Sequence, residues 1–346
     1  MGLVGMAVRE GVRSAQHHQH ERQAAAQHAT VAVPLTGPVV KAPQQPIDGA
    51  RLLNLADAWM GRHVWMGDAA RHTAVLHTAA QHFRLPETGR LAWPKFGKIL
   101  YVASEPGSGK TTAMVCMGYM SAPWFRGIDA NPTAPGLCAS IKEEHAALFI
   151  DEMHRLLGAK GTRKADVVTI LNVGYEKNGT YLNARGGKAS RSPVYASAVM
   201  AGKDVLLTSA SEEISDLIDR CAATIHMRRP PEDVELAEVT DETQAQGEAI
   251  AGQLAAWAAQ EMADPDRFRE AFTVACDRAR EIGLTGRAKD VWVPLIATGW
   301  LASPGHADAA CRAALEFRKN RPVMEEDPLA GLEAQLAGAG GLPSWG

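Results

Sequence analysis

The stretch Lys98-Ile-Leu-Tyr-Val-Ala-Ser-Glu-Pro-Gly-Ser-Gly-Lys-Thr-Thr112 decides the fold of this 346-residue chain. Its first seven residues are mostly apolar and predict a buried strand that leads directly into a glycine-rich turn. Helix-forming residues follow from Thr112 onward. A strand, a turn ending in Gly-Lys-Thr and a helix are together typical of a phosphate-binding P-loop. The usual first glycine of that pattern is Ser104 here.

The residue types in this turn suit the binding of ATP. Gly107 and Gly109 allow successive backbone N–H groups to point at phosphate oxygens, and the following helix adds its partial positive charge. Lys110 is expected to reach the β- and γ-phosphates, and the Thr111 hydroxyl to hold Mg²⁺. The alternative is a surface turn that contains Gly-Lys-Thr by accident. The predicted nucleotide-binding residues are Glu105, Pro106, Gly107, Ser108, Gly109, Lys110, Thr111 and Thr112.

A second motif, Leu148-Phe-Ile-Asp-Glu152, follows farther along the chain. An apolar strand that ends in Asp151 brings a carboxylate to the same sheet edge as the turn, where it can hold Mg²⁺. Glu152 can orient and deprotonate an attacking water molecule. The alternative is that Asp151 only caps a helix. The acidic pair favours ATP hydrolysis over a small-molecule kinase, because a kinase needs no residue that activates water.

Further apolar runs at 146–150, 194–199 and 222–227 are separated by helical stretches. Strands that alternate with helices predict an α/β fold with a parallel sheet between helices. Over 47–82, helical spacing predicts two or three short helices, interrupted at Gly61 and Gly67. The predicted divisions are a mobile leader (1–45), an N-terminal helical segment (46–97), an ATPase core (98–232), a separate helical lid (233–322) and a flexible tail (323–346).

Two local signals refine the helical lid, and one concerns the leader. Asp264-Pro265 predicts a helix start, and Gly283 predicts a helix end. The leader carries four histidines, for which a metal-binding tract and a mobile leader are the two interpretations, and we favour the second. The histidines are His17, His18, His20 and His28.

Composition limits the class of protein. The chain is 46% hydrophobic and has a net charge of −3, so it can bury a core and has no overall basic character. Its five cysteines have no CxxC spacing, which predicts a reducing compartment. No signal peptide and no long apolar run is evident in the sequence. We therefore expect a cytoplasmic protein with no membrane partner.

A local basic stretch departs from this near-neutral average. Residues 160–191 carry seven Lys or Arg against Asp166 and Glu176, a net +5. Asn178-Gly179 lies between β-prone residues and predicts a hairpin turn. Such a hairpin could bind DNA, with basic side chains on phosphates and a tyrosine stacked on bases. The alternative is a solvated basic loop with packed aromatic residues. The candidate contacts are Lys177, Tyr181, Arg185 and Lys188, with Tyr175 as a second stacking residue.

Several segments together resemble the uncharacterised P-loop ATPase domain found in primase–helicase proteins of phages, plasmids and integrative elements. The resemblance covers roughly residues 48–318, and the order and spacing of its motifs make it specific. The segments are Ala146-Ala-Leu-Phe-Ile-Asp-Glu-Met-His-Arg-Leu-Leu157, Ile170-Leu-Asn-Val-Gly-Tyr175, Asp219-Arg220, Met227-Arg-Arg-Pro-Pro-Glu232 and Gly286-Arg-Ala-Lys-Asp-Val-Trp-Val-Pro-Leu295.

The resemblance implies a three-layer, additional-strand P-loop NTPase fold similar to AAA+ and superfamily-three helicase ATPases. It implies a Mg²⁺-dependent ATPase that forms a homo-oligomeric ring, such as a hexamer, and acts on DNA as a helicase or helicase loader with a replication partner protein. An ATP-gated regulatory module that binds a protein partner is the alternative.

The resemblance also assigns roles to four further residues. Arg220 lies where ring ATPases carry an arginine finger, with an ion pair to Asp216 or Asp219 as the alternative. Arg287 is expected to sense nucleotide from the lid, with a plain helix-terminus charge as the alternative. Ser197 or Lys203 is expected to fill the polar sensor position between phosphate and Glu152.

Overall fold

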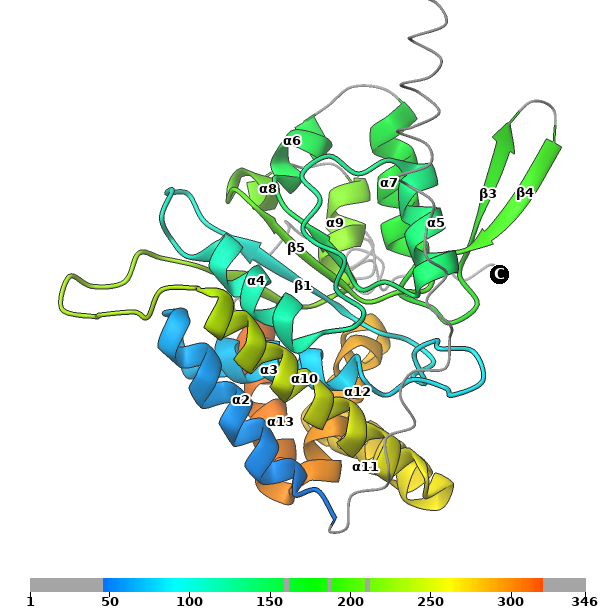
Figure 1. The fold of residues 1–346 in the computed structure, drawn as a ribbon. Coiled ribbons are helices and arrows are strands. Elements are labelled where there is room, and N and C mark those ends of the chain that lie inside the picture. Colours follow the sequence, from blue (N-terminus) through cyan, green and yellow to red (C-terminus); the bar gives the residue numbers. More distant parts are fainter. Residues whose placement is uncertain (1–45, 159–161, 186–187, 209–211, 320–346) are drawn as a thin grey trace, which may run out of the picture. The chain divides into compact units, whose positions relative to one another are not determined.

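Four parallel strands form the central sheet in the order β2-β5-β1-β6. Figure 1 labels the two middle strands, β1 and β5. The computed structural model describes residues 46–158, 162–185, 188–208 and 212–319. Within the sheet, Leu100 pairs with Met200 and Phe149 pairs with Val199, so β5 separates β1 from β2. The strands span Lys98–Val102 (β1), Leu148–Ile150 (β2), Ala198–Gly202 (β5) and Cys221–His226 (β6).

The outer side of β2 is covered by residues 125–129, which run parallel to it through isolated bridges. The Asp129 N–H donates to the Phe149 carbonyl at 2.8 Å, and the Asp151 N–H donates to the Asp129 carbonyl at 3.0 Å. Although β2 has only three residues, backbone hydrogen bonds therefore hold it on both sides. This fixes the position of the acidic residues that follow it.

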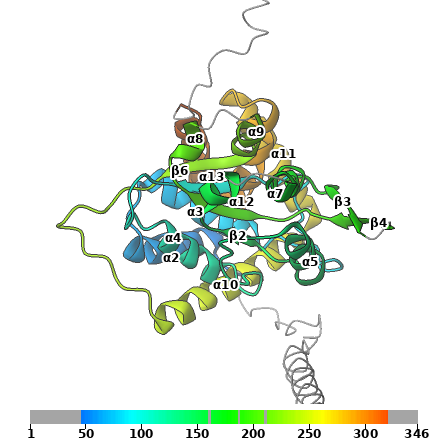
Figure 2. The ribbon, with the colours of Figure 1, turned by 90° about the horizontal axis from the view of Figure 1, so that it is seen from above.

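The sheet separates two buried clusters, because successive side chains of a strand point to opposite faces. Ile99 and Tyr101 belong to one cluster, and Leu100 and Val102 belong to the other. Figures 1 and 2 show helices on both sides of the sheet. The prediction of an α/β fold with a parallel sheet is confirmed.

The helices divide between these two faces. The Ile99 face is covered by α2 (Gly49–His63), α3 (Asp68–Ala80), α4 (Lys110–Met120), α10 (Asp241–Met262), α11 (Pro265–Glu281), α12 (Gly286–Ala302) and α13 (Pro304–Lys319). The Leu100 face is covered by α5 (Ala134–Glu144), α6 (Met153–Gly158), α7 (Thr162–Val173), α8 (Val205–Thr208) and α9 (Glu212–Asp219). No helix in the described ranges is long and apolar enough to cross a membrane.

Helix ends follow the local sequence signals. The Asp264 side chain accepts hydrogen bonds from the first-turn N–H groups of α11, and Pro265 occupies the first helical position. The helix ends at Glu281, two residues before Gly283. Both predicted signals are confirmed. The predicted interruption at Gly61 is wrong because α2 continues through it, whereas Gly67 does precede α3.

The C-terminal helices share their core with the N-terminal ones. Trp257 of α10 packs edge-on against Phe83 at a ring separation of 5.5 Å, and Phe268 of α11 stacks on Phe83 at 5.8 Å. A Cβ at Gly49 would lie 2.5 Å from the Trp257 ring, so α2 and α10 approach closely. The helices expected to form a separate lid thus pack directly on the helices that precede β1. The predicted leader, and the predicted tail from residue 323, lie outside the described residues.

The basic stretch does form a hairpin, but its turn is not at Asn178-Gly179. Strand β3 (Thr180–Arg185) pairs with β4 (Lys188–Pro193) in antiparallel register, with Arg185 opposite Lys188. The predicted position of the turn is wrong because the backbone just before Gly179 pairs with a different segment. Tyr175 and Lys177 exchange hydrogen bonds with residues 94–96 rather than with β3. Gly179 closes a turn onto Glu176 that leads into β3.

The third strand is displaced from its predicted position at 194–199. The Val194 N–H donates to the Gly179 carbonyl and the Ala196 N–H to the Gly174 carbonyl, so these residues are bonded outside the sheet. Strand β5 therefore begins only at Ala198. The apolar residues at 194–196 indicate burial, and burial alone does not distinguish a strand from a buried loop.

Candidate functional site

The carboxyl edge of the sheet brings four chain segments together. Because the four strands are parallel, the residues after β1, β2, β5 and β6 all emerge at this edge. They are the glycine-rich loop (residues 104–109), Asp151 and Glu152, Lys203, and Met227 to Arg229. The Met227 N–H donates to the Val102 carbonyl at 2.8 Å, which joins the last of these segments to the start of the loop.

The glycine-rich loop has the backbone that a phosphate site requires. Gly107 and Gly109 have φ of 77° and 83°, in the left-handed region that favours glycine. Gly109 is the N-cap of α4, so the first free N–H groups of that helix face the loop. Ser108 is buried, and its Oγ accepts a hydrogen bond from Lys110 Nζ at 3.2 Å. The loop therefore places a helix N-terminus and a lysine ammonium together, which suits an anion.

Thr111 and Asp151 meet across the sheet. The hydroxyl of Thr111, in the first turn of α4, donates to Asp151 Oδ2 at 3.0 Å, although β5 lies between β1 and β2. The other carboxylate oxygen, Oδ1, accepts from the Glu152 N–H at 2.6 Å. Hydroxyl and carboxylate oxygens are hard ligands of the kind Mg²⁺ prefers, and a protein usually supplies only one or two of them beside phosphate oxygens and water. These two residues therefore fit a magnesium ion.

Glu152 follows directly and has an unusual backbone. Its φ is 55°, which is uncommon for a residue with a side chain. Its carboxylate lies 2.7 Å from Arg155 Nε and 3.5 Å from His154 Nε2. Burial lowers the pKa of His154, and Lys203 and Arg155 lower it further, while Glu152 opposes them. In this conformation Glu152 lies at the site with its carboxylate held by Arg155.

Arg229 is a residue of this edge that the sequence interpretation missed. Its Nε donates to the Pro106 carbonyl at 2.9 Å and lies 3.8 Å from Glu105 Oε2. A Cβ at Gly107 would lie 3.5 Å from the same nitrogen. A guanidinium group thus lies over the glycine-rich loop. The available signal was the place of Arg229 two residues after the last apolar run, at the edge where the loop also lies.

The two predicted arginines lie elsewhere. Arg220 precedes β6 at the amino edge, and its Nη1 donates to the Asp216 carbonyl at 2.7 Å and lies 3.2 Å from Asp216 Oδ1. Its side chain is 12% exposed, and it lies over the Tyr175 ring at 5.3 Å. The ion pair named as the alternative is present, and the finger role toward a second subunit stays a prediction.

Arg287 converges on the same carboxylate. Its Nη1 lies 2.8 Å from Asp216 Oδ1, which joins the start of α12 to α9. Burial opposes the shift, but hydrogen bonds from Arg287 and Arg220 lower the pKa of Asp216. Arg287 therefore contacts Asp216 at the amino side of the sheet in this conformation, and the nucleotide-sensing role stays a prediction.

The two sensor candidates lie at opposite edges. Ser197 immediately precedes β5 and is buried at the amino edge, away from the glycine-rich loop. Lys203 immediately follows β5 and is exposed at the carboxyl edge. Only Lys203 has the position that a sensor of this site requires.

The predicted DNA contacts are distributed along the hairpin. Lys177 is exposed in the turn before β3. Tyr181 packs partly against the buried cluster that contains Leu100. Burial, together with a hydrogen bond to Asp166, raises the pKa of Tyr181 to about 12. Arg185 and Lys188 are paired in the backbone register at the end of the ladder. The structure thus places three basic residues on the hairpin or its approach, and anchors the tyrosine at its base.

Comparisons with known proteins add no assignment: no protein-family model and no curated protein matches this chain. In the described ranges, no group of three or more His, Cys, Asp or Glu side chains could by itself hold a metal ion. A magnesium ion at Thr111 and Asp151 would thus complete its ligand shell with phosphate oxygens and water.

Proposed function

We propose that this protein binds ATP together with Mg²⁺ at the carboxyl edge of its sheet and hydrolyses it. The observation that carries the proposal is the 3.0 Å hydrogen bond between Thr111 and Asp151. It joins the residue after the Gly-Lys pair to the carboxylate of a strand two positions away, which is the pairing that a nucleotide-bound magnesium ion requires.

Each residue of the site has a defined task. The amides of residues 107–110 and the N-terminus of α4 would hold the phosphates, and Lys110 would exchange Ser108 for a phosphate oxygen. Thr111 and Asp151 would hold Mg²⁺, which withdraws charge from the β- and γ-phosphates when bound. Glu152 would exchange its ion pair with Arg155 for the attacking water and accept a proton at its carboxylate.

Two substitutions test this proposal. Lys110→Ala should abolish ATP binding, whereas Glu152→Gln should still bind ATP and hydrolyse it slowly. Exposed residues of the same type provide matched controls, Lys319→Ala on α13 and Glu270→Gln on α11, and both should behave as the unaltered protein. ATP binding by Lys110→Ala at normal affinity would refute the nucleotide site. Equal hydrolysis by the unaltered protein and Glu152→Gln would refute the role of Glu152.

We further propose that the ATPase is an oligomeric motor on DNA, a helicase or a helicase loader. The basic hairpin supports this, because β3 and β4 extend away from the sheet in both views (Figures 1 and 2) and carry Arg185 opposite Lys188. Cationic side chains on a projecting element suit contact with a phosphate backbone. An ATPase assay with and without single-stranded DNA, together with a mass measurement in ATP, tests the motor and its assembly.

An ATP-gated module that binds a protein partner is the second candidate. Leu182 of β3 is 55% exposed on the same hairpin, where an apolar side chain suits contact with a protein better than contact with a phosphate backbone. Substitution of Lys177, Arg185 and Lys188 by Gln separates the two candidates. On a motor, it should reduce DNA-stimulated hydrolysis and flatten its salt dependence. If DNA never stimulates hydrolysis, the motor proposal fails and the module remains.

A further inference from the structure

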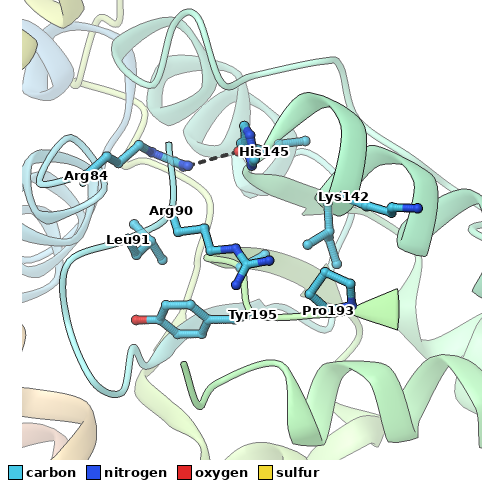
Figure 3. Close-up of a pocket in the computed structure, with 10 residues that line it drawn as sticks. Arg84, Arg90, Leu91, Lys142, His145, Pro193 and Tyr195 are labelled. Atoms are coloured by element: carbon cyan, nitrogen blue, oxygen red, sulfur yellow. Dashed lines mark hydrogen bonds between the residues drawn. The ribbon is translucent and has the colours of Figure 1, made fainter. Parts of the chain in front are cut away.

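A second cationic site lies at the amino edge of the sheet, away from the glycine-rich loop. It is a small cavity of about 20 Å³ bordered by Ala146, which precedes β2, Ala196, which precedes β5, and Pro193, which ends β4 (Figure 3). None of the residues that line it is acidic. The basic residues that line it are Arg84, Arg90, Lys142 and His145.

Arg84 is held rigidly in the wall of this cavity. Its Nε donates to the Gln81 carbonyl at 2.9 Å, and its Nη1 donates to the carbonyls of Gly89 and His145 at 2.8 and 3.0 Å. The guanidinium also stacks on the Trp124 ring at 4.1 Å. The remaining nitrogen, Nη2, is buried and has no hydrogen-bond partner. A buried donor without a partner costs free energy of folding. The fixed guanidinium of Arg84 therefore keeps one N–H group without an acceptor.

The charges around Arg84 are uncompensated. Figure 3 shows the Arg90 side chain extending toward Pro193 beside the Tyr195 ring, while Lys142 lies at the rim. Burial lowers the pKa of Arg84 to about 9. Burial also lowers the pKa of His145, and the charges of Arg84 and Arg90 lower it further. Burial thus disfavours the charged forms of both side chains, and no acidic residue in the lining offsets it.

We propose that this cavity binds one phosphate group, which would supply the negative charge that its lining lacks. Arginine donors and phosphate oxygens form strong, charge-assisted hydrogen bonds. A volume of about 20 Å³ admits one or two oxygen atoms, so the rest of the ligand remains at the surface. The site is separate from the glycine-rich loop and does not depend on ATP hydrolysis.

Two sources can present such a phosphate group. One is a free phosphate or a phosphomonoester, and the other is the backbone of a nucleic-acid strand that runs from the hairpin, whose strand β4 ends at the cavity with Pro193. Arg191, two residues earlier, is exposed on β4 and opposite Leu182 in the ladder. Strand β4 therefore joins its exposed Arg191 to the border of the cavity at Pro193.

The test uses the full chain with Lys110→Ala in the background, which removes phosphate binding at the glycine-rich loop. Inorganic phosphate is titrated by calorimetry, and a fluorescent single-stranded oligonucleotide is titrated by anisotropy at fixed salt. Arg90→Gln removes an exposed cation of the cavity, and Arg84→Lys keeps charge while losing the fork of donors. Arg51→Gln, at an exposed position of α2, is the matched control. Thermal melting establishes that each variant is folded.

We expect Arg90→Gln and Arg84→Lys each to weaken binding about tenfold relative to Arg51→Gln, as for the loss of a charge-assisted hydrogen bond. If the oligonucleotide competes with phosphate, the source is a nucleic-acid backbone. If phosphate binds through both arginines without that competition, the source is free phosphate or a phosphomonoester. If neither ligand depends on Arg90 in a folded variant, the proposal is overturned, whatever the behaviour of Arg84→Lys.

Discussion

Substitution of Gly109 by alanine separates backbone strain from steric crowding at the glycine-rich loop. The φ of Gly109 is 83°, and an added Cβ would meet only Met227 Cε at 3.8 Å, which is ordinary contact. An alanine side chain therefore fits at this position, and the cost in stability comes from the left-handed backbone conformation. For a residue with a Cβ that cost is about 1–2 kcal/mol. Gly109→Ala should destabilise the protein by this amount.

Gly252→Ala provides the matched control with the opposite sign. Gly252 lies exposed inside α10, and a Cβ there would meet nothing within 4 Å. Alanine in an exposed helix interior is about 1 kcal/mol better than glycine. Two identical chemical changes should thus differ by about 2–3 kcal/mol in the free energy of unfolding. Denaturation by urea measures this difference.

Nucleotide affinity gives an independent readout of the same pair. If alanine moves residue 109 to negative φ, the loop amides turn away from the phosphates, and ATP binding should weaken by an order of magnitude or more. Gly252→Ala should leave ATP binding unchanged. Equal stability of the two variants would refute the reasoning, because it would mean that the folded loop does not hold Gly109 at positive φ.

Three other substitutions have defined outcomes. Asp216→Asn should cost at most about 1 kcal/mol, since the Asp216 side chain is 43% exposed. The pKa of Asp216 is lowered in the folded state, so its contribution to the free energy of unfolding is present at neutral pH and lost as the pH falls below about 4. The melting temperature of the variant should therefore vary less with pH over that range. Burial lowers the pKa of His82 to about 4 in the folded protein. As the pH drops from about 6.5 to 4, the unfolded chain binds a proton that the folded protein does not, so the free energy of unfolding should fall. His82→Gln should flatten that decline in a series of melting temperatures measured against pH. Arg229→Gln should weaken ATP binding by up to about tenfold without changing the melting temperature, since this side chain is 61% exposed over the loop; unaltered affinity would exclude Arg229 from the site.

The sheet and its acidic edge were predictable because their signals are local. An apolar run followed by a glycine-rich turn marks β1, and a run followed by Asp151 marks β2. Parallel strands then require both ends to meet at one edge, without any knowledge of distant contacts. The hydrogen bond between Thr111 and Asp151 follows from that geometry.

The features that escaped prediction depend on contacts between distant segments. The backbone of Tyr175 and Lys177 is bonded to residues 94–96, and this moves the hairpin turn away from Asn178-Gly179. The contact of Arg229 with the Pro106 carbonyl joins positions more than a hundred residues apart. The cationic cavity likewise draws on three separate segments, 84–91, 141–146 and 193–196. No periodicity or spacing in the sequence predicts such contacts between distant segments.

The arrangement of the two candidate sites constrains how one can influence the other. The glycine-rich loop and Asp151 lie at the carboxyl ends of the strands, while the cavity around Arg84 lies before the amino ends of β2 and β5. The two sites therefore lie at opposite ends of the strands, and the sheet and the helices on it connect them. Strand β2 is the shortest such route, because Ala146 borders the cavity and Asp151 holds Thr111, with only three strand residues between Ala147 and Asp151. Since coupling between two binding equilibria is reciprocal, a phosphate at the cavity that alters ATP affinity must have its own affinity altered by ATP to the same extent.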